Sequence, residues 1–152
     1  VIGHGYSPSI DISSKNYGSF SETFNITAYA DVIVIKTMEI FLTSGNSVTL
    51  PFVWSTTGVT KGSYAIKAEA IPVPGETETL DNTLTDGTVL VTIPGDVNGD
   101  RLCDMMDIVQ LILHFMCKKG QPCYVANFDI NCDGVIDMVD IVTAILHFGQ
   151  KW

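Results

Sequence analysis

The sequence of 152 residues lacks any apolar run of the roughly 20 residues that a membrane-spanning helix needs. It also lacks the basic segment followed by an apolar one that marks a signal peptide. Basic residues are scarce, with 8 Lys and Arg against 17 Asp and Glu and a net charge of −9. Such an acidic chain does not suit nucleic acid, whose phosphates need Lys and Arg. Because the first residue is Val1 rather than Met, we expect a processed product or a piece of a longer protein.

Motifs of common hydrolases are missing too. The chain contains neither GxSxG nor HExxH, and its three His lie in no catalytic pattern. We therefore predict that the protein is not an enzyme.

The composition changes at Pro94-Gly95. All four Cys and four of the five Met follow this point, and every acidic residue after it is Asp. Before it, Thr, Ser, Val and Tyr dominate. We predict two domains, residues 1–94 and residues 95–152.

The first domain has the pattern of an all-β protein. Segments rich in β-branched and aromatic residues, bounded by Gly, Pro, Asn or Asp, predict strands at 9–14, 23–30, 32–42, 47–54, 62–70 and 87–93. Short strands at this spacing favour an immunoglobulin-like antiparallel β-sandwich, in which Trp54 would lie in the core. A seventh strand is expected, so the first strand either precedes Val1 or comes from a partner. Asn25 begins an Asn-Ile-Thr sequon and is a candidate glycosylation site inside a predicted strand.

The second domain contains an internal repeat with an offset of 33 residues. Residues 96–115 (DVNGDRLCDMMDIVQLILHF) align with residues 129–148 (DINCDGVIDMVDIVTAILHF) at 12 identities in 20 positions. The repeated polar residues occupy positions 1, 3, 5, 9 and 12 of a loop, and an apolar helical pattern follows each loop. The two units extend over residues 96–117 and 129–150.

This spacing predicts two calcium sites. Calcium takes six to eight oxygen ligands, which a tight loop supplies from alternating side chains and the carbonyl of position 7. Two such ions would neutralise the charge of −4 carried by residues 95–152. Magnesium is a weaker candidate because it prefers a smaller site with several waters. The predicted ligands are Asp96, Asn98, Asp100, Leu102, Asp104 and Asp107 in the first loop, and Asp129, Asn131, Asp133, Val135, Asp137 and Asp140 in the second.

The duplicated unit differs from an EF-hand. Pro94-Gly95 stands where an EF-hand would have its first helix, and position 12 is Asp rather than Glu. Position 6 is Gly134 in the second loop but Arg101 in the first. With its opening GDVNGD, the region 95–150 resembles a dockerin domain, a calcium-dependent module that docks secreted enzymes and surface proteins onto cohesin domains.

This resemblance implies two antiparallel helices, 105–117 and 138–148, each with a calcium loop at its start. It also implies a cohesin partner on a scaffold or surface protein, an extracellular location and no membrane insertion; we favour a monomer. The family reads its partner at positions 10, 11, 17 and 18 of each unit. Alternatively, most of these apolar residues are core between the helices. They are Met105, Met106, Ile112 and Leu113 in the first unit, and Met138, Val139, Ile145 and Leu146 in the second.

The first domain resembles the CARDB module of archaeal and bacterial surface proteins. The runs GYSPSIDISSKNYGSFSETFNITAYAD and WSTTGVTKGSYAIKAEAIPVPGETETLDN carry the likeness, which covers residues 4–93. It implies an immunoglobulin-like spacer or adhesion module, with the family's first strand missing here.

Four cysteines leave several pairings open. Cys117–Cys123, Cys117–Cys132 and Cys123–Cys132 are all compatible with an extracellular protein, while Cys103 is a candidate for a buried free thiol. A zinc site formed by these cysteines with His114 and His147 lacks the usual CxxC spacing.

Two functions remain from the sequence. The first is a docking module whose calcium-ordered helices bind a cohesin-type partner. The second is a calcium-stabilised structural or adhesion module at the end of a surface protein, without a separate partner.

Overall fold

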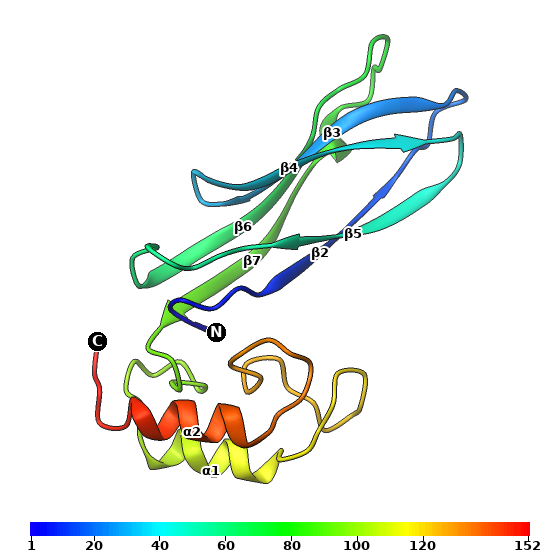
Figure 1. Ribbon diagram of the computed structural model, residues 1–152. Helices are drawn as coiled ribbons and strands as arrows, with labels where there is room; N and C mark the ends of the chain where they lie inside the picture. Colours follow the sequence, from blue (N-terminus) through cyan, green and yellow to red (C-terminus); the bar gives the residue numbers. More distant parts are fainter. The chain divides into compact units, whose positions relative to one another are not determined.

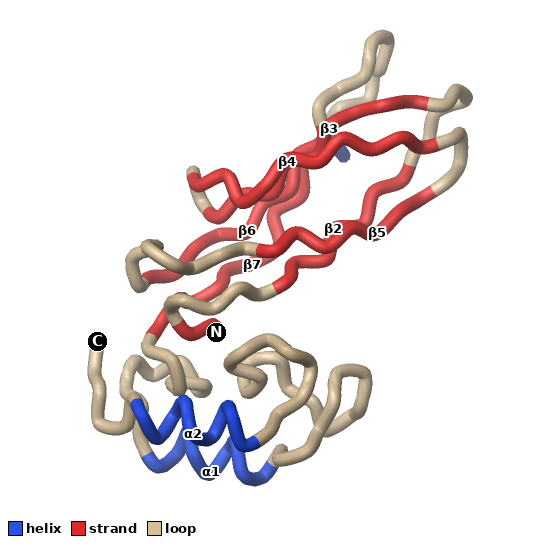
Figure 2. The backbone as a smooth tube through the Cα atoms, in the orientation of Figure 1, coloured by secondary structure: helices blue, strands red, loops and turns tan.

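The computed structural model describes all 152 residues (Figure 1). Seven strands and a short 3-10 helix at Leu80–Asn82 precede two α-helices, as Figure 2 shows by colour. The strands are β1 (Ile2–Gly3), β2 (Ser9–Lys15), β3 (Glu22–Ala30), β4 (Ile33–Leu42), β5 (Ser47–Val53), β6 (Gly62–Ala70) and β7 (Thr83–Thr92). The helices are α1 (Met105–Leu113) and α2 (Met138–Leu146).

The strands form two sheets. One has the order β1-β7-β6-β3-β4, in which β1 pairs with β7 in parallel while β3 pairs with β4 and β6 in antiparallel fashion. The other consists of β2 and β5, which are antiparallel. A bulge interrupts the pairing of β3 with β4 between Ala28 and Tyr29.

By packing, the chain divides into two compact units. One comprises Ser9–Trp54 and Tyr64–Thr88, and the other comprises Val1–Pro8, Ser55–Ser63 and Val89–Trp152. These units follow packing alone, and the boundary at Pro94-Gly95 stays a prediction.

The first of these units has a core between its two sheets. Side chains alternate between exposed and half-buried along β2 and β5, so one face of this small sheet points inward. The buried cluster joins residues of both sheets, namely Ile26, Ala28, Ile40, Leu42 and Phe52. Trp54 is buried as predicted and meets Tyr64 edge to face.

The other unit is centred on the two helices, which run in opposite directions side by side (Figure 1). Leu111 and Ala144 contribute the buried side chains of α1 and α2, and Ile136 of the second loop is fully buried in the same cluster. Tyr6, from the start of the chain, packs against the same cluster. Its other buried members are Ile93, Val97, Cys103, Cys117, Phe128, Ile130 and Ile141.

A β-rich first part and a last part with two helices are confirmed, but several predicted ends are wrong. The last strand begins at Thr83 rather than at residue 87. The expectation that the first strand precedes Val1 or comes from a partner is wrong, because β1 lies within the chain and makes the seventh strand. With only two residues it is too short to give a sequence pattern. The helices end at Leu113 and Leu146 rather than at residues 117 and 148. The chain turns away at Met116 and Gly149, whose φ angles of 66° and 78° lie in the left-handed region.

Candidate metal-binding loops and exposed helix face

Each helix begins with a capping box of two Asp residues. In α1, Asp104 accepts a hydrogen bond from the Met106 amide at 2.7 Å, and Asp107 accepts one from the Asp104 amide at 2.9 Å. Asp137 and Asp140 repeat these bonds in α2 at 2.7 and 2.8 Å. Such pairs satisfy amides at the helix start that have no partner within the helix, and their charge suits the helix dipole.

The second Asp of each box also closes its loop. Asp107 accepts hydrogen bonds from the amides of Val97 and Asn98, at the opposite end of the loop, at 2.9 and 3.2 Å. It is fully buried, as is Asp140, which closes the second loop in the same way. Desolvation raises the pKa of both carboxyls, although the backbone hydrogen bonds act in the opposite direction. The backbone amides that donate to Asp107 and Asp140 fix the positions of both carboxylates.

The polar side chains inside the loops repeat as well. The amide group of Asn98 donates to Asp100 at 3.0 Å, and Asp100 accepts from the Leu102 amide at 2.9 Å. Asn131 and Asp133 form the matching contacts in the second loop. Both loops thus gather carboxylate and amide oxygens within a few residues of backbone.

Each loop is tied to the segment that follows the other helix. The Cys103 amide donates to the Gln150 carbonyl at 3.0 Å, and the Gly149 amide returns a bond to the Cys103 carbonyl at 2.8 Å. Ile136 makes the corresponding pair of bonds with Met116 and Cys117, at 2.7 and 2.9 Å. The two halves therefore hold each other through equivalent hydrogen bonds.

Position 6 of the loops has the same backbone conformation in both copies despite its different residues. Arg101 and Gly134 both have positive φ, at 73° and 91°. The left-handed conformation costs a non-glycine residue such as Arg101 about 1 kcal/mol or more in free energy. The Arg101 guanidinium also lies 5.0 Å from the centre of the Trp152 ring.

The donor set of the loops fits calcium. It consists of oxygen atoms, and none of the eight loop Asp residues forms a salt bridge, since Lys67–Glu69 is the only one in the structure. Uncompensated buried carboxylates are costly, and a hard dication removes that cost. The loop oxygens are hydrogen-bonded to amides, and no three His, Cys, Asp or Glu side chains are grouped to hold a metal ion. The oxygen donors of the loops therefore suit calcium, and which of them bind the ion stays a prediction.

The outer face of the helices is apolar and exposed. All eight residues predicted to contact a partner are solvent-exposed, from 51% for Val139 to 73% for Leu113 and Leu146. The alternative that these residues form the core between the helices is therefore wrong. Sequence reasoning missed five further exposed apolar residues, although they belong to the same all-round apolar pattern: Val109, Phe115, Met116, Val142 and Phe148.

Comparison with known families decides what this region resembles. Residues 94–146 match the family model of the dockerin type I domain. Among curated proteins, none matches the chain.

Solved structures resemble the chain over 59% to 93% of its length. The CARDB domain of a Pyrococcus furiosus protein, solved in complex with di-metal ions, is 21% identical with a TM-score of 0.53, and the match covers 60% of this chain and 84% of that one. This likeness shows the CARDB fold in the β-rich part. A domain of a Methanosarcina acetivorans protein described as a candidate cell-surface protein is 26% identical, with a TM-score of 0.48 over 59% of this chain and 81% of its own. A mutant type II cohesin–X–dockerin complex from Acetivibrio cellulolyticus matches over 93% of this chain and 96% of that one, at 17% identity and a TM-score of 0.34.

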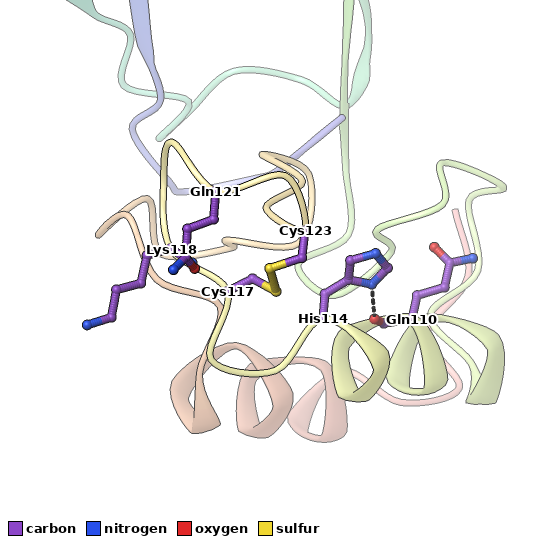
Figure 3. Close-up of a disulfide and its surroundings, with 6 residues drawn as sticks. All are labelled: Gln110, His114, Cys117, Lys118, Gln121 and Cys123. Carbon is purple, nitrogen blue, oxygen red and sulfur yellow. Dashed lines mark hydrogen bonds between the residues drawn. A yellow bond between two sulfur atoms is a disulfide. The ribbon is translucent and has the colours of Figure 1, made fainter.

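The four cysteines of residues 95–152 include one disulfide, Cys117–Cys123 (Figure 3). Cys103 is free and buried, and Cys132 is free and exposed. The Nδ1 atom of His114 lies 2.8 Å from the Gln110 carbonyl, and His147 makes the same contact with Thr143. These groups do not gather into a zinc site.

The sequon residue Asn25 lies half-buried in β3, opposite Glu39 of β4. Neither α-helix has the length and apolarity to span a membrane.

Proposed function

We propose that the chain is a non-catalytic docking module that binds a cohesin-type partner in the presence of calcium. In this role it tethers a secreted or cell-surface protein into an extracellular assembly, with an immunoglobulin-like sandwich as its spacer. The carrying observation is the apolar face of α1 and α2, exposed beside two loops that gather oxygen ligands. The match of residues 94–146 to dockerin type I supports this assignment.

Each loop would hold one calcium ion through the predicted ligands of its copy. The ion would supply positive charge that offsets the carboxylates of its loop. Asp107 and Asp140 already link the start of each loop to the first turn of its helix through backbone amides. Calcium would therefore stabilise the arrangement that presents both helices.

The helix face suits an apolar partner. Exposed apolar side chains of this number are unusual on a protein that has no partner, and flexible Met side chains adapt to varied surfaces. Because Leu113 and Leu146 occupy matching positions with equal exposure, a partner could bind in either of two orientations related by 180°.

The structural role is the alternative, and one observation favours it. Residues 1–8 and 55–63 pack into the same compact unit as residues 89–152, with Thr56 bonded to the carbonyls of Gly3 and Tyr6. A region tied down in this way could stiffen the end of a surface protein. Under this alternative the apolar helix face does not bind a partner protein.

An extracellular location is part of the proposal. The Cys117–Cys123 disulfide supports it, since such bonds persist in oxidising compartments.

The two roles are separated by changing the most exposed helix residues. The double variant Leu113→Ser/Leu146→Ser is compared with Leu84→Ser, which alters an exposed Leu of β7. Binding to a panel of immobilised cohesin domains is measured with calcium and with chelator. We expect calcium-dependent binding of the unaltered chain and of Leu84→Ser, and none by the double variant, whose melting temperature stays unchanged because surface residues contribute little to stability. A double variant that melts much earlier, or that binds as the unaltered chain does, would contradict docking through this face.

A further inference from the structure

The first Asp of each loop receives a hydrogen bond from a side-chain hydroxyl outside the loop. Thr92 Oγ1 donates to Asp96 Oδ2 at 2.5 Å, and Tyr124 OH donates to Asp129 Oδ2 at 2.6 Å. These donors are not copies of each other, because the residue 33 positions after Thr92 is Val125. The same contact is therefore made from two unrelated places in the chain.

Each hydroxyl donates to the equivalent carboxylate oxygen, Oδ2, of its own Asp. Oδ2 of Asp96 also accepts from the Arg101 amide at 2.9 Å, and Oδ2 of Asp129 accepts from the Gly134 amide at 2.8 Å. Each Oδ2 thus has two donors, while each Oδ1 has a single amide donor from within the loop. With both Asp residues 2% exposed, water cannot replace a missing donor easily.

The two donors are themselves held firmly. Thr92 is fully buried at the end of β7, where its carbonyl accepts from the His4 amide at 2.8 Å. Tyr124 follows the disulfide-bonded Cys123, packs against the buried cluster, and donates its amide to Gln121 at 3.0 Å. Both donors thus belong to well-packed parts of the unit.

We propose that Thr92 and Tyr124 are positioning residues for the two calcium sites. Each hydroxyl fixes Oδ2 of the first Asp and leaves Oδ1, which has a single amide donor, as the oxygen that would bind the ion. The assignment rests on the proposed calcium binding. Partners that orient metal ligands in this way typically account for about 10- to 100-fold in metal affinity.

The test is calcium titration calorimetry on chelator-treated protein. Thr92→Val and Tyr124→Phe remove one hydroxyl each at nearly constant volume, and Thr92→Ser restores a hydroxyl. Thr49→Val and Tyr29→Phe, which lie in β5 and β3, are matched controls. We expect each single variant to lower the calcium affinity of one of the two sites about 10- to 100-fold. The combined variant should lower the affinity of both sites. Thr92→Ser and the controls should bind calcium like the unaltered protein.

Other outcomes overturn the assignment in distinguishable ways. Two ions bound with unchanged affinity by both variants would refute the positioning role alone. An equal weakening of both ions by each single variant, together with a lower melting temperature of the calcium-free protein, would show a general structural role instead. No calcium binding by the unaltered chain would refute the proposed sites themselves. As a second measurement, the calcium-induced change in the near-ultraviolet tyrosine band should be smaller in Tyr124→Phe than in Tyr29→Phe. Equal changes in the two variants would count against the assignment of Tyr124.

Discussion

Replacing Gly95 by Ala should destabilise the helical unit by two separable effects. Gly95 has a φ of 97°, and a Cβ atom there would lie 2.6 Å from Ala144 Cα and 2.9 Å from Cys103 Sγ. The left-handed backbone costs an Ala residue about 1–2 kcal/mol, and overpacking a core costs about 1–3 kcal/mol more. We expect a total loss of about 2–5 kcal/mol in the free energy of unfolding.

The chain contains a control for this substitution. Gly120 has a φ of 90°, and a Cβ atom added there would meet nothing within 4 Å, so Gly120→Ala isolates the backbone cost. Denaturant unfolding followed by the helical circular dichroism signal gives both free energies. Equal losses in the two variants would refute the close packing of Gly95 on α2.

Three further predictions concern the same unit. The double variant Cys117→Ser/Cys123→Ser should lose about 2 kcal/mol of unfolding free energy, because the short loop closed by the disulfide gains entropy when unfolded; an unchanged denaturation midpoint would argue against this. Asp107→Asn should cost at least about 2 kcal/mol, because the buried carboxylate accepts three amide hydrogen bonds, and the exposed Asp100→Asn should cost less; similar losses would count against the closing role of Asp107. The calcium-free protein should become more stable as the pH falls from neutral toward about 4. Burial raises the folded pKa of Asp107 and Asp140 above the unfolded value, so the folded state takes up protons first. Thermal melting across this range checks the sign, and a steady fall in the melting temperature would show it to be reversed.

The starts of the helices could be predicted from the sequence, whereas their ends could not. Asp104 and Asp137 precede Met105 and Met138, and an Asp three residues after each cap completes a local signal. The apolar pattern continues past Leu113 to Phe115 and Met116, so it carries no stop signal. The helix nevertheless ends at Leu113, and the Met116 amide bonds to the Ile136 carbonyl of the other repeat, a contact distant in sequence.

The candidate site was predictable only as far as the repeat extends. Matching positions identify the loop Asp and Asn residues, because both copies carry them in one register. Thr92 and Tyr124 have no matching partner, so only folding reveals that their hydroxyls reach equivalent carboxylates. The packing of Tyr6 against the helical core was hidden for a similar reason, since more than 80 residues separate it from the cluster.

The most direct test of the central claim is to count calcium ions by native mass spectrometry. Chelator-treated protein is returned to calcium and compared with the Asp100→Ala/Asp133→Ala variant, which lacks one exposed carboxylate in each loop. We expect two ions on the unaltered chain and fewer on the variant. No bound ion on the unaltered chain, or two ions retained by the variant at the same calcium concentration, would contradict the account.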